Sequence, residues 1–347
     1  MTSGRIIGGF IFPAAWEDRD RFVELVAALG DCGVNALFTE SETYDPAAIE
    51  IARKRGLSFY AGVSCFSDHA NHNRLLTERP ELWPILETGE RRPAMEWYIG
   101  INPTDRRHQE HVLTCIRSIA ETCDIDGLVL DFIRWPLHWE LELRPGAPPP
   151  LDSSFDAGTI AALERASGIA VPRRLESTAS IASWIKARHS SEWLEFKCRV
   201  ITDFVAEARR ALADANAHAK LGIYLVPAPD RSREELVGQR LVDLAPLVDL
   251  VAPMLYHNGL LQPPRWVEAL LAEVAEVAGR KSLPVLQVDS GDATADLGPP
   301  MMDQDFEAVL TAIAEHPDVA GWAFFTGNAL VNTGRGALVR KAVGGRG

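Results

Sequence analysis

The sequence DIDGLVLDFIRWP, residues Asp124–Pro136, decides how the rest of the chain is interpreted. It contains a short run of apolar residues that favour β-structure. A carboxylate, Asp131, follows this run at once, and then come Arg134, a tryptophan and a proline. A strand that served only the hydrophobic core would not need a carboxylate at its end. Asp131 is therefore the first candidate for a functional residue.

Side chains alternate along a strand, so residues two apart share one side of it. If Asp131 faces the mouth of a barrel, Val129 and Gly127 face the barrel interior as well. Leu128 and Leu130 then face the surrounding helices, where large aliphatic side chains are needed for packing. An Asp131–Arg134 ion pair with a purely structural role is the alternative interpretation of the same residues.

Seven further apolar runs of the same kind occur, at residues 5–12, 33–40, 57–66, 219–227, 248–256, 283–289 and 319–327. Helical patterns separate them, at residues 18–32, from 45 onward, and at 105–123, 191–217, 233–246, 264–278, 303–315 and 335–343. Eight strands alternating with helices, with runs too continuous to be half-exposed, predict a parallel (β/α)8 TIM barrel. A doubly wound open sheet is the structural alternative, but the count of eight and the lack of a GxGxxG motif favour the barrel.

Two connections are longer than a barrel needs, and both follow strands on the C-terminal side. The first insertion, about residues 67–104 after strand three, contains a predicted hairpin that turns at Thr88 and Gly89. The second, about residues 135–190 after strand four, contains a proline-rich piece and a short predicted helix at 156–167. We expect residues 1–347 to form a single domain that carries both insertions.

Composition excludes several classes of function. The 347-residue chain is 47% hydrophobic and has a formal net charge of −13, which argues against nucleic-acid or anionic-membrane partners. No apolar run reaches the roughly 18 residues of a membrane helix, and the N-terminus is interpreted as a strand, not a signal peptide. Five scattered cysteines form no metal-binding or disulfide pattern, so a cytoplasmic location is the simplest expectation. The oligomeric state cannot be predicted from these features.

Polar and aromatic side chains occur where the other predicted strands end. They are Glu40, Glu42, Tyr256, His257, Asn258, Gln287, Asp289, Trp322, Phe325 and Asn328. In a TIM barrel these strand ends meet at one rim. Carboxylates, amides and aromatic rings together are typical of a sugar-binding surface, and two carboxylates flanking a glycosidic bond can cleave it. No GxSxG elbow or phosphate-binding loop is present, and we expect no cofactor.

One stretch in the first insertion has an alternative interpretation as a metal-binding site. Asp68, His69 and His72 have a spacing that could hold a metal ion. Because they lie on a long polar loop without an obvious further ligand, we expect solvated surface residues and no metal.

The opening stretch resembles the DGIHLDYIRYP signature of glycosyl-hydrolase-like family 10 of TIM-barrel proteins. Asp126, Gly127, Asp131, Arg134 and Pro136 match that signature outright. Similar pieces occur at GINPTDRRHQEHV, FDAGTIAALERASG, VDLVAPMLYHN and GWAFFTGNAL, so the resemblance spans roughly residues 101–330. It implies a (β/α)8 barrel that hydrolyses a glycan with carboxylates, and it places the signature aspartate at Asp131 and the strand-six tyrosine at Tyr256.

A more distant likeness to family 18 chitinases fails at two positions. Those enzymes end strand four in D-G-x-D-x-D-x-E, whereas this chain has Val129 in place of an aspartate and Ile133 in place of the acidic glutamate. Substrate-assisted chitinase chemistry is therefore not expected.

Together these features predict a retaining-type glycoside hydrolase with Asp131 as nucleophile or charge stabiliser. Glu40 and Asp289 are the main candidates for the acid/base. Asp230 is a third candidate of lower rank. The residues expected to orient the sugar are Arg134, Tyr256, His257, Gln287 and Asn328, and those expected to stack on it are Trp135, Trp322 and Trp97. A non-catalytic carbohydrate-binding barrel and a metal-dependent hydrolase using the Asp68–His72 stretch are the competing hypotheses.

Overall fold

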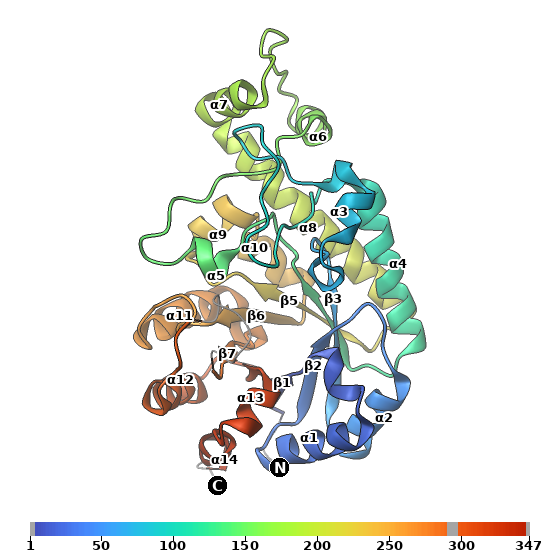
Figure 1. Ribbon diagram of the computed structural model, residues 1–347, viewed down its shortest axis with the longest axis vertical. Coiled ribbons are helices and arrows are strands. Elements are labelled where there is room, and N and C mark those ends of the chain that lie inside the picture. Colours follow the sequence, from blue (N-terminus) through green and yellow to red (C-terminus); the bar gives the residue numbers. More distant parts are fainter. Residues whose placement is uncertain (1–3, 290–297, 345–347) are drawn as a thin grey trace.

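Eight parallel strands form a closed barrel, which confirms the predicted (β/α)8 fold (Figure 1). The computed structural model describes residues 4–289 and 298–344. Each strand pairs with the next, and the last closes on the first through the register Ile6 to Gly321. The strands are β1 (Ile6–Phe10), β2 (Ala36–Glu40), β3 (Ser58–Ser64), β4 (Gly127–Asp131), β5 (Lys220–Leu225), β6 (Leu250–Leu255), β7 (Val285–Gln287) and β8 (Gly321–Phe325).

Helices surround the barrel, and several begin where an aspartate can cap them. The side chains of Asp18, Asp45, Asp105 and Asp156 each accept a hydrogen bond from a backbone N–H of the first helical turn. The main barrel helices are α1 (Arg19–Asp31), α2 (Pro46–Lys54), α4 (Arg106–Thr122), α8 (Ser190–Ala215), α11 (Arg265–Ala278), α12 (Asp303–Glu315) and α14 (Gly336–Gly344). The shorter ones are α3 (Arg74–Glu78), α5 (Trp139–Glu142), α6 (Ala157–Ser167), α7 (Thr178–Arg188), α9 (Asp230–Val237), α10 (Leu241–Leu244) and α13 (Gly327–Asn332).

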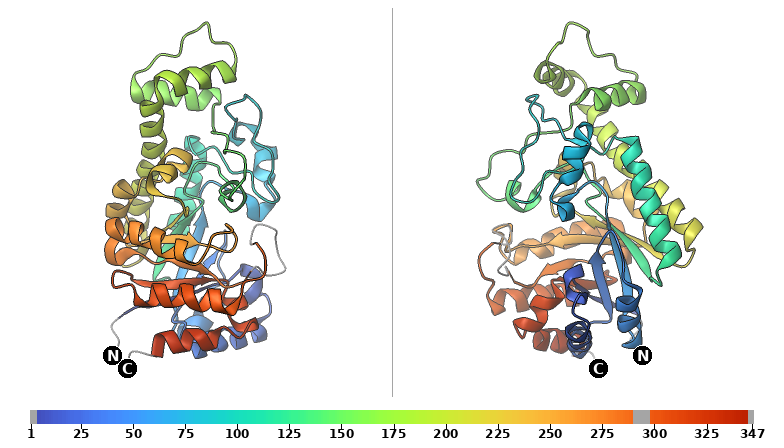
Figure 2. Two further views of the ribbon diagram at one scale, coloured as in Figure 1. Left: turned by 90° about the vertical axis from the view of Figure 1, so that its left-hand side faces the viewer. Right: turned by 45° about the vertical axis from the view of Figure 1, so that its right-hand side comes forward.

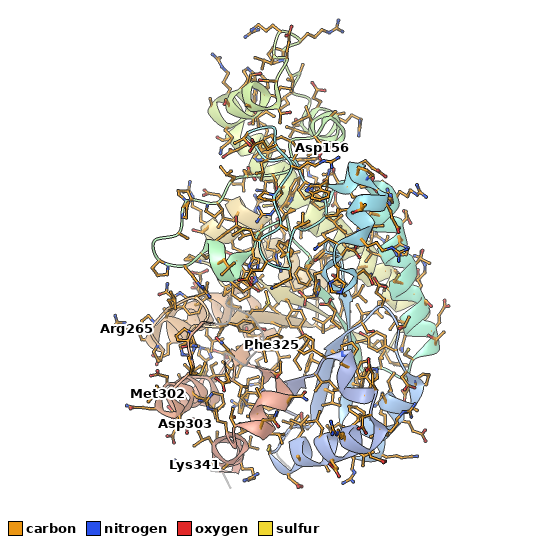
Figure 3. The ribbon with its side chains drawn as sticks, in the orientation of Figure 1. Asp156, Arg265, Met302, Asp303, Phe325 and Lys341 are labelled. Carbon is orange, nitrogen blue, oxygen red and sulfur yellow. The ribbon has the colours of Figure 1, made fainter. Side chains whose placement is uncertain are left out.

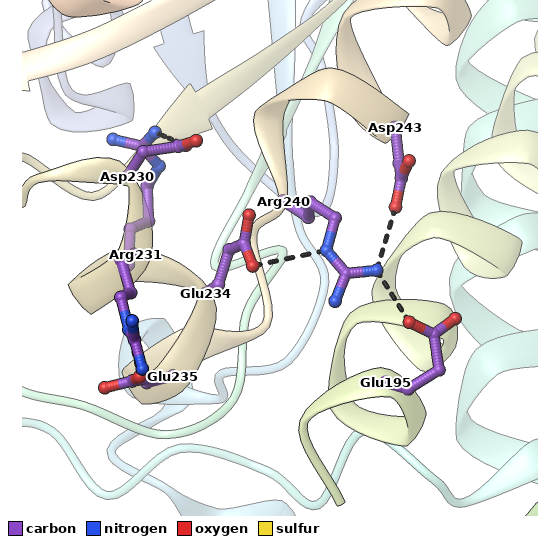
Figure 4. Close-up of polar contacts among 8 residues, drawn as sticks. Glu195, Asp230, Arg231, Glu234, Glu235, Arg240 and Asp243 are labelled. Carbon is purple, nitrogen blue, oxygen red and sulfur yellow. Dashed lines mark hydrogen bonds and ion pairs between the residues drawn. The ribbon is translucent and has the colours of Figure 1, made fainter. Parts of the chain in front are cut away.

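The single helix predicted at residues 233–246 is wrong, because the chain breaks there into α9 and α10. Gly238 ends α9 with a φ of +70°, and a Cβ at this position would lie 2.7 Å from the carbonyl oxygen of Lys197. Arg240 then joins the two pieces to α8 through Glu234 at 3.2 Å and Glu195 at 2.7 Å (Figure 4). The glycine is needed both for its left-handed backbone and for the close approach of α8.

Two layers of apolar side chains hold the barrel together. Val129 packs with the residues that fill the barrel interior, whereas Leu128 and Leu130 pack in the layer between strands and helices. The alternation predicted for the stretch ending at Asp131 is therefore confirmed. Inside the barrel the rings of Phe38 and Tyr60 stack with centroids 4.6 Å apart, so the interior below the mouth is filled.

Both insertions are structured and lie beyond the C-terminal ends of the strands (Figure 2). The predicted hairpin is present, with Gly89 at a φ of +94° and antiparallel pairing of Ile85 with Arg91. In the second insertion, α6 and α7 stand away from the barrel beside the N-terminal part of α8. The buried Lys197 fastens this insertion to α8, because its ammonium group donates to Asp152 Oδ1 at 2.7 Å. Among the described residues, no helix combines the length and apolarity that a membrane span requires.

Candidate active site

A cavity of about 390 Å³ opens at the mouth of the barrel. Four carboxyl groups line it: Glu40, Asp131, Glu140 and Asp289. Its aromatic wall includes Phe10, Phe12, Trp97, Trp139, Tyr256 and Phe325. Figure 3 places Phe325 at the end of β8 toward the middle of the molecule, whereas the labelled Arg265 and Lys341 belong to the outer helices. The cavity thus has the composition expected of a sugar-binding site at the rim predicted from the strand ends.

Glu40 and Asp131 lie in hydrogen-bonding contact on this rim. They come from β2 and β4, with one strand, β3, between them. Glu40 pairs in register with Gly62 of β3, and Asp131 pairs with Ser64. Because Gly62 has no side chain, nothing projects from that position of β3 to separate the two carboxyl groups. The contact between them could not be foreseen from either strand alone.

Burial raises the pKa of Glu40 well above its ordinary value, and the negative charge of Asp131 raises it further. The guanidinium group of Arg134 acts in the opposite direction but does not reverse the shift. Asp131 Oδ1 accepts a hydrogen bond of 2.6 Å from the backbone N–H of Phe132. The raised pKa favours the protonated form of Glu40 beside Asp131.

A histidine from the first insertion faces the same carboxyl group. His69 Nε2 lies 3.6 Å from Glu40 Oε1, and His69 Nδ1 lies 3.1 Å from Ser67 Oγ. The backbone N–H of His69 donates to this hydroxyl at 3.4 Å, which leaves the hydroxyl proton free to point at Nδ1. Burial lowers the pKa of His69 to about 4, so the ring is neutral. The Nε2 atom of this ring faces Glu40 at a distance longer than a hydrogen bond.

The metal site considered for this stretch is not formed in the structure. Asp68 instead accepts hydrogen bonds from the backbone N–H of Leu75 at 2.6 Å and from Asn71 at 3.1 Å, which folds the loop. Within residues 4–289 and 298–344, no group of three or more His, Cys, Asp or Glu side chains is arranged to hold a metal ion.

Arg134 is fully covered by protein and lies beside the carboxyl pair. Its guanidinium carbon is 4.6 Å from the ring centre of Phe132 and 5.6 Å from that of Tyr98. These contacts with two ring faces hold a cation at the cavity wall. Arg134 therefore lines the cavity at the place predicted from the DFIRWP stretch.

The other predicted site residues divide into two groups. Trp97, Tyr256 and Asp289 line the cavity, as expected. Gln287 faces the barrel interior, but its side-chain oxygen accepts the backbone N–H of Gly259 at 3.0 Å and so holds the loop after β6. His257, Asn328 and the reserve candidate Asp230 are outside the lining, and Asp230 pairs with Arg233 of α9 (Figure 4).

The stacking role expected for Trp135 and Trp322 does not fit their positions. Both side chains are buried in the layer between strands and helices. On β8 it is Ala323 and Phe325 that face inward, so Trp322, three residues before Phe325, must face outward. Trp135 donates its ring N–H to the carbonyl oxygen of Lys197 at 3.0 Å and packs against Trp193.

Several lining residues were not predicted. Phe10 ends β1 and Phe12 lies two residues beyond it, and their rings contact each other and Phe325 with centroids 5.2–5.8 Å apart. The alternation of side chains at the end of β1 could have indicated that these two residues face the cavity. Trp139 and Glu140 belong to the short helix α5 in the second insertion, where no strand pattern locates a side chain.

We expect Glu40→Gln to stabilise the fold increasingly as the pH rises. The folded-state pKa of Glu40 is raised above its unfolded value, so its stabilising contribution is complete at low pH and is lost as the pH rises through the folded-state pKa. Between the two pKa values the difference grows by about 1.4 kcal/mol for each pH unit. Thermal unfolding of both proteins from pH 5 to pH 9 measures it.

The same substitution at the exposed Glu24 of α1 controls for the amide itself. A stability difference between Glu40→Gln and wild type that stays constant or shrinks with rising pH would contradict the assignment of the proton to Glu40.

Residues 35–268 match the sequence model of one protein family, DUF4015, described as "Putative glycosyl hydrolase domain". The match covers more than half of the chain. The family differs from the one that the DGLVLDFIRWP stretch resembles, but its description agrees with the expected glycosyl hydrolase class. A search of curated protein sequences gives no match.

Solved structures share the fold. The glycoside hydrolase domain of PgaB (BpsB) from Bordetella bronchiseptica superposes with a TM-score of 0.70 at 14% identity, covering 98% of each chain. A β-galactosidase from Halorubrum lacusprofundi has a TM-score of 0.63 at 14% identity, covering 92% of this chain and 52% of the other. The β-amylase catalytic domain from Paenibacillus polymyxa has a TM-score of 0.63 at 12% identity, covering 94% and 93%.

Proposed function

The chain belongs to the DUF4015 family, and on that premise we propose that it hydrolyses a glycosidic bond of an oligo- or polysaccharide in the cavity at the barrel mouth. The observation that carries the proposal is the Glu40–Asp131 pair. A buried carboxyl group whose pKa is raised is suited to general acid catalysis of glycoside cleavage.

In this proposal Glu40 donates its proton to the glycosidic oxygen as the bond to the anomeric carbon breaks. The carboxylate of Asp131 keeps that proton on Glu40 beforehand and stabilises the positive charge that develops on the sugar ring. His69, with its neutral ring, holds Glu40 in place without competing for the proton. Arg134 limits the rise of the Glu40 pKa, which keeps the acid strong enough to release its proton.

The aromatic wall supports a carbohydrate as the ligand. Trp97 lines the cavity and contacts the rings of His69 and Phe132 at 5.2 and 6.2 Å. On the other side, Tyr256 and Phe325 stack with centroids 5.1 Å apart. The apolar face of a sugar ring can pack against such walls while its hydroxyl groups reach the carboxylates.

The likeness to PgaB supports the reaction class through that protein's description as a glycoside hydrolase domain. At 14% identity it supports no particular sugar or linkage. The expected product is therefore a shortened glycan with a new reducing end, from a substrate that must be found by experiment.

The test is release of reducing ends from a panel of α- and β-linked oligo- and polysaccharides, with and without a chelator. Wild-type protein should cleave at least one member, and chelation should not change the rate. Binding of a glycan without cleavage by wild-type protein would select the carbohydrate-binding barrel instead. Loss of activity on chelation would select a metal-dependent hydrolase.

On the glycan that is cleaved, we expect Trp97→Ala to raise KM about tenfold with a small change in kcat. The indole supplies stacking area that the bound sugar and the transition state use equally. Trp184→Ala, a partly buried tryptophan on α7 outside the cavity, is the matched control for loss of an indole. An unchanged KM for Trp97→Ala would remove Trp97 from the substrate site.

A further inference from the structure

We propose that Glu140 is the second catalytic carboxylate of this site, acting as a general base, and that His138 is its positioning residue. The inference rests on the proposed function, because it assigns the partner that the Glu40–Asp131 pair needs. Carboxyl groups that flank a glycosidic bond are about 5–5.5 Å apart in retaining enzymes and about 6.5–9.5 Å apart in inverting ones. Glu40 and Asp131 are in hydrogen-bonding contact, so they cannot stand on opposite sides of the bond.

Glu140 lines the same cavity as Glu40. Glu40 ends β2, whereas Tyr256 follows β6, and these strands are diametrically opposed in an eight-stranded barrel. Trp139, which precedes Glu140 in the sequence, packs on Tyr256 with ring centroids 5.4 Å apart. Burial raises the pKa of Tyr256, and the nearby charges of Asp131 and Glu140 add to the effect.

One carboxylate oxygen of Glu140, Oε2, lies against the side chain of His138. His138 Nδ1 lies 3.2 Å from Glu140 Oε2, and the histidine side chain is completely buried. Among residues 4–289 and 298–344, neither atom has a well-aligned hydrogen-bond partner, although both are shielded from water. Buried polar groups without partners are costly and concentrate at functional sites. Since Oε2 is buried and the side chain as a whole is 12% exposed, the exposed part includes atoms other than Oε2.

The backbone around Glu140 is fixed from both sides. Glu142 Oε2 accepts the backbone N–H of His138 at 2.6 Å, and the same carboxylate forms an ion pair with the buried Arg92 of the first insertion. The ring of His138 also contacts that of Trp97 at 5.0 Å. The two insertions therefore clamp the segment that carries Glu140, which gives the position the rigidity that catalysis needs.

The resulting reaction is a single displacement. Glu140 accepts a proton from a water molecule, whose oxygen forms a bond to the anomeric carbon. The bond between that carbon and the glycosidic oxygen breaks, and the leaving alcohol takes the proton of Glu40. Glu140 ends protonated and Glu40 ionised, and exchange with solvent restores both. Attack from the face opposite the leaving group inverts the anomeric configuration.

The test uses the full chain and the glycan that wild-type protein cleaves. Glu140→Gln should lower kcat at least a hundredfold with KM changed less than threefold, because a base acts on the transition state. Glu140→Asp should recover part of that loss. Glu176→Gln, at an exposed position between α6 and α7, should match wild type. Thermal unfolding of each variant verifies the fold. If Glu140→Gln does not fold, the kcat of Glu140→Asp relative to wild type tests the role of Glu140 instead.

Asp289→Asn is the rival variant, because Asp289 lines the same cavity. If Asp289→Asn loses the activity and Glu140→Gln keeps more than a tenth of it, the inference is wrong. The anomer formed first, read by proton NMR, is an independent check, and a retained configuration would overturn the role of base. Failure of the proposed function would give another result: wild-type protein would cleave no glycan, or Asp131→Asn would remain active.

His138→Asn should lower kcat about tenfold, and adding it to Glu140→Gln should cause no further loss of kcat. A histidine that serves only the fold would lower the activity of both backgrounds equally. Equal losses in the two backgrounds would contradict the positioning role.

Discussion

Replacing Asp131 by asparagine should lower kcat at least about a thousandfold and leave the fold intact. Asparagine keeps the shape and an oxygen that can accept the backbone N–H of Phe132, a hydrogen bond of 2.6 Å in the structure. It removes the negative charge that raises the pKa of Glu40 and that would face the developing positive charge of the sugar. Reducing-end assays on a cleaved glycan give kcat, and thermal unfolding gives the stability.

Asp318→Asn is the matched control, since Asp318 is an exposed residue before β8 and outside the cavity lining. An Asp131→Asn protein that unfolds would favour the structural ion-pair interpretation of Asp131 and Arg134. A folded variant with wild-type activity would remove Asp131 from catalysis.

Gly321→Ala should abolish folding, with an expected loss of more than about 4 kcal/mol of stability. Gly321 opens β8 and pairs with Ile6 of β1, where the barrel closes. Its φ is +150°, and a Cβ would lie 1.9 Å from the carbonyl oxygen and 2.6 Å from the nitrogen of Ile6. Both are backbone atoms, so relief would require the two strands to separate. Urea unfolding, or the yield of soluble protein, measures the effect.

Gly30→Ala provides the contrast for that substitution. Gly30 lies in α1, and a Cβ there meets nothing within 4 Å. Alanine should therefore stabilise the protein by about 0.5–1 kcal/mol, through helix propensity and a less flexible unfolded chain. If the free energy of unfolding of Gly321→Ala lies within 1 kcal/mol of the wild-type value, the closure of the barrel does not depend on a glycine at this position.

The barrel could be predicted from the sequence because each strand is a continuous apolar run, and several of the helices between strands begin at an aspartate cap. Periodicity and caps act within a few residues, so all eight strands were located. The break at Gly238 was missed, because its cause is the approach of Lys197 of α8, which is distant in the sequence. Local patterns carry no information about such contacts.

The residues of the candidate site could be predicted where they lie on strands, because side chains alternate there, but not where they lie in the insertions. Alternation correctly gave the sides of Leu128, Val129 and Leu130 before Asp131, whereas Glu40 was proposed only because it ends a strand. Alternation applied to β8 would also have turned Trp322 outward, and it was not applied there. Glu140 lies in an irregular insertion, where only the tertiary contacts of His138 and Glu142 decide its direction. The protonation of Glu40 likewise depends on packing across Gly62, which the sequence does not reveal.

The most direct test of the central claim is a crystal structure of Asp131→Asn with an uncleaved oligosaccharide that wild-type protein hydrolyses. The expected result is a glycosidic oxygen within about 2.6–3.2 Å of the Glu40 carboxyl group, with a sugar ring against Trp97. An oligosaccharide bound across the mouth with Glu40 distant from every glycosidic oxygen would contradict the assignment of Glu40 as the acid.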